Sequence, residues 1–233
     1  MIPGAIVLCS TSARRHQLLG DACRRSGCAF HWIDPGLDDA ELRPGSTSPG
    51  AFCAALAYLK ARAGQERLER SSGSSVGSSV GGQVGELVGR QVGGMAPEVI
   101  LGADTICLDR GEIIGKAGDA GQARQILRRF SACEHEVLTG VAILRPRVGV
   151  RTLLIDRARV RVGVLGERLI ERYLRTGLWR GKAGAYNLFE RLDAGWPITY
   201  EGDPTTIVGL PMEVLAPMLG LEFAHERCAG GAA

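Results

Sequence analysis

The chain has 233 residues, of which 45% are apolar and 23% are charged, an ordinary composition for a globular protein with a sizeable hydrophobic core. The formal net charge is only +3, with acidic and basic residues interspersed, and no apolar run approaches the roughly 20 residues that span a bilayer. These features argue against a dedicated nucleic-acid surface and against a membrane-embedded protein.

The cysteines and the first residues indicate the compartment. Seven cysteines are present, an odd number with no C-x-x-C pair, so that neither a zinc site nor a disulfide framework is indicated. They are best explained as small core residues. The first residues lack the basic region and the long apolar core of a signal peptide. We therefore expect a reducing, cytoplasmic environment.

The first predicted element is a buried strand at 5–9, followed by an amphipathic helix. Between them lie Ser10 and Ser12, with Arg14 and Arg15 in the first turn of the helix. A strand, a hydroxyl-rich turn and a helix N-terminus make an anion site, and arginine has a planar fork that suits phosphate oxygens. The alternative is a serine helix cap followed by exposed arginines.

The next predicted elements are a strand at 30–33 and a helix that begins at Pro49. A polar stretch between them carries four acidic residues, including Asp39. On the helix, Lys60 flanks the apolar stripe and is expected either to reach into a cleft or to lie along the surface with its ammonium in water. The segment 65–97 is rich in glycine and serine and lacks periodicity, which predicts a flexible insertion within one domain.

The stretch 99–116 combines a predicted hairpin with a carboxylate, a hydroxyl and an ammonium group. An apolar, β-branched run predicts a buried strand, and Asp104 and Thr105 come where such a strand should end. A turn signal at 109–111 predicts a hairpin whose return strand ends at Lys116. A carboxylate in this position can hold a divalent metal or accept a proton from water. The alternative is that Asp104 caps a turn and Lys116 is a solvated surface lysine.

Periodicity predicts the remaining elements. They are a helix capped by Asp119, strands at 136–144, 148–154 and 157–164, a helix at 167–176, a small-residue loop at 181–186 that carries Lys182, and a last helix that begins at Pro211.

Seven short motifs resemble the Maf family of nucleoside triphosphate pyrophosphatases, once called septum-formation inhibitors. The motifs are Ser10-x-Ser12-x-Arg14-Arg15, Lys60-Ala61, Gly102-Ala103-Asp104-Thr105, Ile114-Gly115-Lys116, His135-x-Val137-x-Thr139-Gly140-Val141, Lys182-Ala183-Gly184-Ala185-Tyr186 and Val208-Gly209-Leu210-Pro211. Each motif is short, but their order and approximate spacing agree with the family across nearly the whole chain.

The resemblance implies an α/β fold in which helices flank a mixed, elongated and twisted sheet, with two lobes and a central cleft, similar to the inosine-triphosphatase superfamily. It also implies hydrolysis of a nucleoside triphosphate between the α and β phosphates, which gives a monophosphate and pyrophosphate. A divalent cation, Mg²⁺ or Mn²⁺, is implied as the cofactor.

The resemblance also assigns roles to residues. Asp104 is the catalytic residue, as the general base or as a metal ligand, and Asp39 is a second metal ligand. The substrate-binding residues are Ser10, Ser12, Arg14, Arg15, Lys60, Thr105, Lys116, Lys182 and Phe189. The arginines and lysines of this set balance the charge of a triphosphate.

The chain departs from the family pattern on both sides of Lys182. Gly181 replaces an aspartate, and Phe189 occupies the position of a glutamine that is linked to pyrimidine recognition. Phenylalanine has no hydrogen-bonding group, so base selection is predicted to depart from the thymidine and uridine preference of the family's best-known branch. The alternative is that Phe189 packs in the core and another residue recognises the base.

These features predict one Maf-like domain at 1–226 with a frayed tail at 227–233. The predicted partner is the nucleoside triphosphate, without nucleic acid or membrane, and a homodimer is the oligomer considered. The alternative function is a non-catalytic nucleotide-binding regulator of cell division. Because the chain keeps Asp104, Lys116 and Lys182, the enzyme is favoured.

Overall fold

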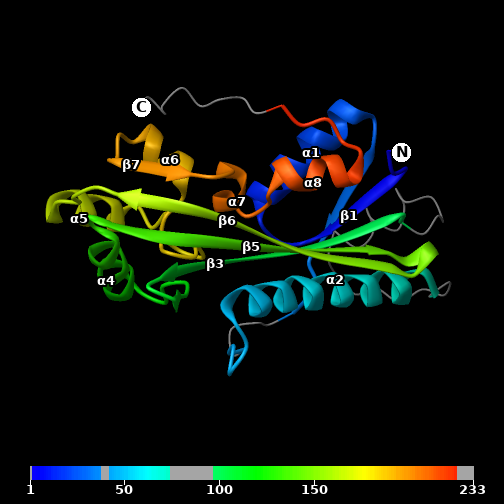
Figure 1. The fold of residues 1–233 in the computed structure, drawn as a ribbon, viewed down its shortest axis with the longest axis horizontal. Helices are drawn as coiled ribbons and strands as arrows, with labels where there is room; N and C mark the ends of the chain where they lie inside the picture. The colour runs from blue at the N-terminus through cyan, green and yellow to red at the C-terminus, as the bar shows by residue number, and fades with distance from the viewer. Residues whose placement is uncertain (1, 38–41, 74–96, 225–233) are drawn as a thin grey trace. The chain divides into compact units, whose positions relative to one another are not determined.

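The computed structural model describes residues 2–37, 42–73 and 97–224, which form an α/β fold with helices flanking a seven-stranded mixed sheet (Figure 1). The strand order is β2-β1-β3-β5-β6-β7, with β4 beside β3. The predicted α/β class, with helices flanking a mixed sheet, is thereby confirmed, and the two lobes with a central cleft stay a prediction. Asp39 and the tail at 227–233 lie outside the described residues. Within the described ranges, no helix has both the length and the apolar character needed to cross a membrane.

The described chain divides into two compact units. The first comprises the residues up to Asp104 together with 140–155 and 212–223, and the second comprises 105–139 and 156–211. Strands β3, β5 and β6 contribute residues to both units.

The first unit is built around parallel strands. β1 (Ala5–Cys9) lies between β2 (Ala29–Ile33) and the beginning of β3 (Val99–Asp109), and both pairings are parallel. The helices of this unit are α1 (Ala13–Ser26), α2 (Pro49–Gly73) and α8 (Met212–Leu219). β1 has the predicted bounds, because five apolar residues between a glycine and a serine leave little choice.

Helices α1 and α2 cover opposite faces of the β1–β2 pair (Figure 1). A Cβ atom on Gly20 of α1 would lie 3.3 Å from the Phe30 ring, and one on Gly64 of α2 would lie 3.3 Å from the Cδ1 atom of Ile33. Phe30 and Ile33 are three positions apart on β2, so their side chains point to opposite faces. The sheet of this unit is therefore covered on both sides, as its parallel strands require.

Helix α2 is longer than its sequence predicts. It runs to Gly73, so that the first residues of the predicted insertion at 65–97 are helical, and the described part of that insertion begins as a regular helix. Side-chain pairs one turn apart support the extension, because Gln65 donates to Glu69 and Leu68 packs against the core of the unit. The described residues do not include 74–96.

The second unit contains the remaining elements. They are β4 (Glu112–Ile114), α4 (Ala120–Phe130), the first part of β5 (Cys133–Arg145), the second part of β6 (Val150–Val162), α5 (Glu167–Arg175), α6 (Leu188–Asp193), β7 (Ile198–Glu201) and α7 (Pro204–Val208). A short 3₁₀ helix, η1 (Pro146–Val148), lies between β5 and β6 in the chain.

The hairpin turn and the helix cap of this unit were predicted correctly, although the return strand β4 ends at Ile114 and not at Lys116. The β3–β4 hairpin turns at Arg110 and Gly111, whose φ angles of 50° and 82° are those of a tight hairpin turn. The Asp119 carboxylate caps α4 by accepting a hydrogen bond from the Gln122 amide at 2.8 Å.

The prediction of two strands at 148–154 and 157–164 was wrong, because β6 is one continuous strand from Val150 to Val162. Asp156 resembles a turn residue in the sequence, but it lies inside the strand and accepts a hydrogen bond from the Thr206 hydroxyl. A tertiary partner thus stabilises a residue that is otherwise disfavoured in strands.

His135 lies in the core of the second unit, only 2% exposed. Its ring stacks on Phe130, with the centroids 3.9 Å apart, and Nε2 lies 2.8 Å from the Tyr186 hydroxyl. Burial lowers the pKa of His135 from its usual 6.5 to about 4, since a charged imidazolium is poorly solvated there.

We predict that this histidine makes stability pH-dependent. Between pH 6.5 and about 4 the unfolded chain binds a proton at His135 and the folded chain does not, so stability falls as the pH falls through this window. The pKa difference corresponds to roughly 3 kcal/mol in the free energy of unfolding. Urea unfolding of wild type and His135→Gln from pH 4 to 7 measures the slope, with His31→Gln as the control. Equal slopes for all three proteins would contradict the prediction.

Candidate active site

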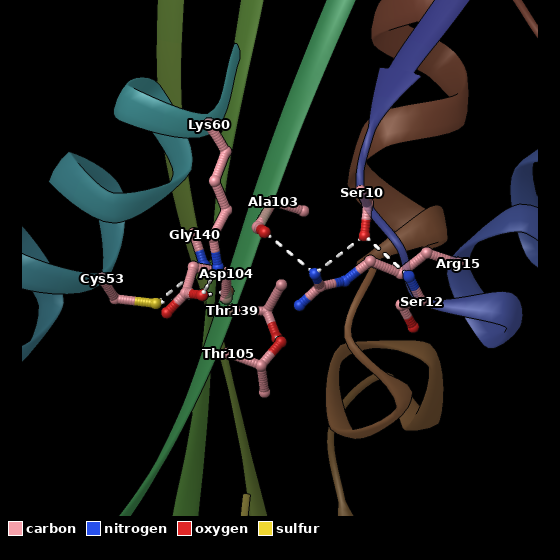
Figure 2. A network of polar contacts seen from close by, with 10 residues as sticks. All are labelled: Ser10, Ser12, Arg15, Cys53, Lys60, Ala103, Asp104, Thr105, Thr139 and Gly140. Atoms are coloured by element: carbon pink, nitrogen blue, oxygen red, sulfur yellow. Dashed lines mark hydrogen bonds and ion pairs between the residues drawn. The ribbon is translucent and has the colours of Figure 1, made fainter. Parts of the chain in front are cut away.

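The first unit contains a buried ion pair. The ammonium of Lys60, on α2, lies 2.5 Å from Oδ1 of Asp104, on β3 (Figure 2). The two side chains are only 12% and 11% exposed. The structure therefore rejects the surface alternative for Lys60 and brings together two predicted site residues that lie 44 positions apart in the sequence.

Small residues let α2 come close enough for this contact. A Cβ atom on Gly102 would lie 2.1 Å from the Ala57 carbonyl oxygen and 2.9 Å from the Ala61 side chain, so only glycine fits there. Ala61 is fully buried against the sheet. The Gly102-Ala103-Asp104 segment and the Lys60-Ala61 pair thus form one packing unit in three dimensions.

The loop after β1 contributes hydroxyl and guanidinium groups. Oγ of Ser10 accepts hydrogen bonds from the Ser12 amide at 3.2 Å and from Arg15 at 3.4 Å (Figure 2). Arg15 also donates to the carbonyl of Ala103, the residue before Asp104, at 2.9 Å. Ser12 is the N-cap residue of α1, but its side chain makes no capping hydrogen bond. The first turn of α1 has no acidic residue, so the helix dipole and the arginines at 14 and 15 both favour an anion.

The sequence did not indicate a role for His16 at this loop. Its ring stacks on Trp32, and Nε2 lies 2.6 Å from the Ser10 carbonyl oxygen. Burial lowers the pKa of His16, so the neutral ring predominates at pH 7. Since a carbonyl oxygen only accepts, the proton of the neutral ring is on Nε2. His16 thereby anchors the backbone beside the Ser10 hydroxyl.

In the second unit, hydroxyl groups form a chain with a defined direction. Thr139 donates to the Thr206 carbonyl at 2.7 Å, and its Oγ1 lies 2.9 Å from Oγ1 of Thr105. Because Thr139 gives its only proton to Thr206, Thr105 must donate to Thr139.

Two predicted lysines also lie in the second unit. An isolated antiparallel bridge between Lys116 and Ala183 aligns their backbones, and the Lys116 side chain is exposed. The ammonium of Lys182 pairs with the Glu190 carboxylate at 2.6 Å and is 13% exposed. The sequence analysis did not identify Glu190 as the partner of Lys182. Glu190 directly follows Phe189, the residue at which the chain departs from the family pattern.

Phe189 is partly buried and packs against the hydrophobic core of the second unit. This contact favours the alternative in which Phe189 is a packing residue. Asn187, two positions earlier, caps α6 by accepting a hydrogen bond from the Glu190 amide at 3.1 Å, which fixes the backbone around Phe189.

The described residues contain no group of three or more histidine, cysteine or acidic side chains arranged to hold a metal ion. Magnesium does not need such a group, because it is commonly bound by one or two carboxylates, water and substrate phosphates. Lys60 occupies Oδ1 of Asp104, while Oδ2 has no hydrogen bond to the described part of the chain. A single carboxylate oxygen fits a magnesium ion that takes its other ligands from a nucleotide.

The fold and these residues define a mixed α/β protein with a buried lysine–carboxylate pair near a loop that carries serine and arginine side chains. The family model described as Maf-like protein matches residues 5–221, and the chain belongs to that family. The resemblance inferred from the short motifs is confirmed.

Curated relatives are similar over almost their whole length. A protein of Pelotomaculum thermopropionicum is 33% identical over 214 residues, which are 92% of this chain and 94% of the relative. One of Symbiobacterium thermophilum is 32% identical over 97% of this chain and 98% of its own. One of Brucella abortus is 32% identical over 92% and 89%. All three are named dTTP/UTP pyrophosphatase.

Proposed function

We propose that the protein is a nucleoside triphosphate pyrophosphatase that hydrolyses nucleoside triphosphates to the monophosphate and pyrophosphate. The observation that carries the proposal is the buried Lys60–Asp104 pair beside Ser10 and Arg15, in a chain of the Maf-like family. The names of the relatives support the same reaction. A carboxylate kept with its lysine partner argues for catalysis and against a purely regulatory nucleotide-binding protein.

The reaction needs a proton acceptor and positive charge. Water adds to the α-phosphorus, the bond from that phosphorus to the α–β bridging oxygen breaks, and pyrophosphate leaves with the bridging oxygen. Asp104 is proposed to take the proton of that water, directly or as a metal ligand. Lys60 neutralises charge that builds on the phosphates.

Other side chains are proposed to bind the nucleotide. Ser10, Ser12, Arg14 and Arg15 bind phosphate oxygens at the N-terminus of α1. Lys116, Lys182 and Thr105 of the second unit are proposed as further substrate-binding residues, the two lysines through their positive charge.

The proposed cofactor is a divalent cation, Mg²⁺ or Mn²⁺, which Asp104 and the substrate phosphates would hold. Asp39 is proposed as a second ligand. Such an ion polarises phosphoryl oxygens and stabilises the charge of the leaving group. Asp104 and Lys60 retain their own roles, which are to accept a proton and to balance charge.

We also propose that the protein works in the cytoplasm on free nucleotides. All the described cysteines are free, and five of the six are buried. The arginine row of β6 at 157, 159 and 161 pairs with glutamates at 136, 201 and 134, which removes the net positive charge that a nucleic-acid surface needs. A homodimer remains the proposed oligomer, and light scattering measures it.

The test is a nucleotide panel. Purified protein is incubated with dTTP, UTP, CTP, GTP and ATP, with Mg²⁺, Mn²⁺ or a chelator, and pyrophosphate is resolved from orthophosphate. We expect equimolar monophosphate and pyrophosphate, and none with the chelator. Release of orthophosphate alone, or no turnover on any nucleotide, would overturn the proposal.

The same nucleotide panel also tests which base the protein prefers. We propose dTTP and UTP as substrates by analogy with the relatives, with weaker discrimination between bases than a glutamine at position 189 would give. Phe189 offers no hydrogen bond to a base edge, whether it faces the base or only packs in the core. The variant Phe189→Gln separates the two cases, because its base preference changes only if position 189 contacts the base.

A further inference from the structure

Cys53 on α2 is fully buried and contacts both of the strands that meet this helix near the ion pair. Its thiol donates to the main-chain carbonyl of Asp104 at 3.3 Å, and its sulfur accepts from the Gly140 amide at 3.2 Å (Figure 2). The thiol therefore links the helix to β3 and to β5 at one point. None of the family motifs recognised in the sequence includes this residue.

The Cys53 thiol suits both hydrogen bonds. A thiol has one S–H donor and a sulfur that accepts, so Cys53 can donate to the Asp104 carbonyl while it accepts from the Gly140 amide. Burial makes an unmade bond costly, because the Asp104 carbonyl and the Gly140 amide are backbone groups at a dry interface.

The helix also packs tightly at this point. A Cβ atom on Gly140 would lie 2.9 Å from the backbone of Cys53 and Ala54, so the helix backbone rests directly on the strand. Seven residues make about two helical turns, which places Cys53 and Lys60 on the same face of α2. One helix face thus contacts Asp104 twice, at its main-chain carbonyl through Cys53 and at its carboxylate through Lys60.

We propose that Cys53 is a positioning residue of the site: its thiol holds the Asp104 backbone against α2 and thereby sets the carboxylate against the Lys60 ammonium. The inference rests on the proposed function in one respect, namely that Asp104 is the carboxylate on which turnover depends. A cysteine that only fills space would stabilise the unit without orienting this pair.

Kinetics separate positioning from packing. We expect Cys53→Ala to lower kcat about tenfold with KM within twofold, because small misplacement of a reacting group costs up to about a hundredfold in rate. Cys53→Ser keeps a donor and an acceptor and should recover most of kcat. The matched control is Cys23→Ala, which removes another fully buried thiol, on α1, and should lower the melting temperature without changing kcat.

A stability measurement tests the inference without turnover. In a double-mutant cycle, the unfolding free energies of Cys53→Ala and Lys60→Met should be non-additive, whereas those of Cys23→Ala and Lys60→Met should add. If Cys53→Ala does not fold, the Cys53→Ser cycle replaces it. An additive Cys53 cycle, an unchanged kcat in Cys53→Ala, or no recovery by serine would overturn the inference. Absence of turnover in wild type with a non-additive cycle would instead overturn only the proposed function.

Discussion

Asp104→Asn is expected to lower kcat by about 10²–10⁴-fold, the range that a positioned general base contributes. Nucleotide affinity should stay the same or rise, because the substitution removes a negative charge 2.5 Å from the Lys60 ammonium and with it a like-charge repulsion of the phosphates. A loss in kcat without a loss in binding is the signature of a group that acts on the chemical step. Pyrophosphate release measures kcat, and calorimetry with an α,β-methylene nucleotide measures affinity.

The matched control is Asp21→Asn, which makes the same chemical change on the surface of α1, where Asp21 pairs with Arg24. That variant should keep wild-type kinetics, because an exposed ion pair of this kind contributes little. If Asp104→Asn kept kcat within a few-fold of wild type, Asp104 would not be the catalytic carboxylate.

Lys60→Met is expected to produce the largest loss of stability among the site variants, roughly 3–5 kcal/mol in the free energy of unfolding. The reason is that the Asp104 carboxylate is 11% exposed and would stay in a dry site without its cation. Chemical denaturation at pH 7 measures the loss. Activity should fall as well, since the same cation is proposed to balance the phosphates.

Two further variants test whether the stability loss of Lys60→Met comes from the unpaired Asp104 carboxylate. The double variant Lys60→Met with Asp104→Asn removes both charges, so it should regain much of the lost stability but none of the activity. Arg24→Met breaks the exposed pair with Asp21 and should cost at most about 1 kcal/mol. Equal stability losses for Lys60→Met and Arg24→Met would refute the view that the Lys60–Asp104 pair is energetically buried.

The sequence by itself determined the elements that depend on neighbouring residues. The strand of β1, the helix cap at Asp119 and the hairpin turn at Arg110 and Gly111 were predicted correctly. Each rests on an interaction within about four residues, such as a side chain bonding a nearby amide or a glycine permitting a positive φ angle. The family motifs are equally local, and the family match confirms the family that they indicated.

The tertiary structure alone decided which side chains meet. Nothing near Lys60 in the sequence shows that its charge is paired with Asp104, because the contact depends on Gly102 admitting α2 to the sheet. In the same way, the sequence alone does not show that Lys182 pairs with Glu190, or that a hydrogen bond from Thr206 keeps Asp156 within β6. Periodicity and turn chemistry act within a few residues, whereas pairing, burial and proton direction depend on packing between segments 8 to 88 positions apart.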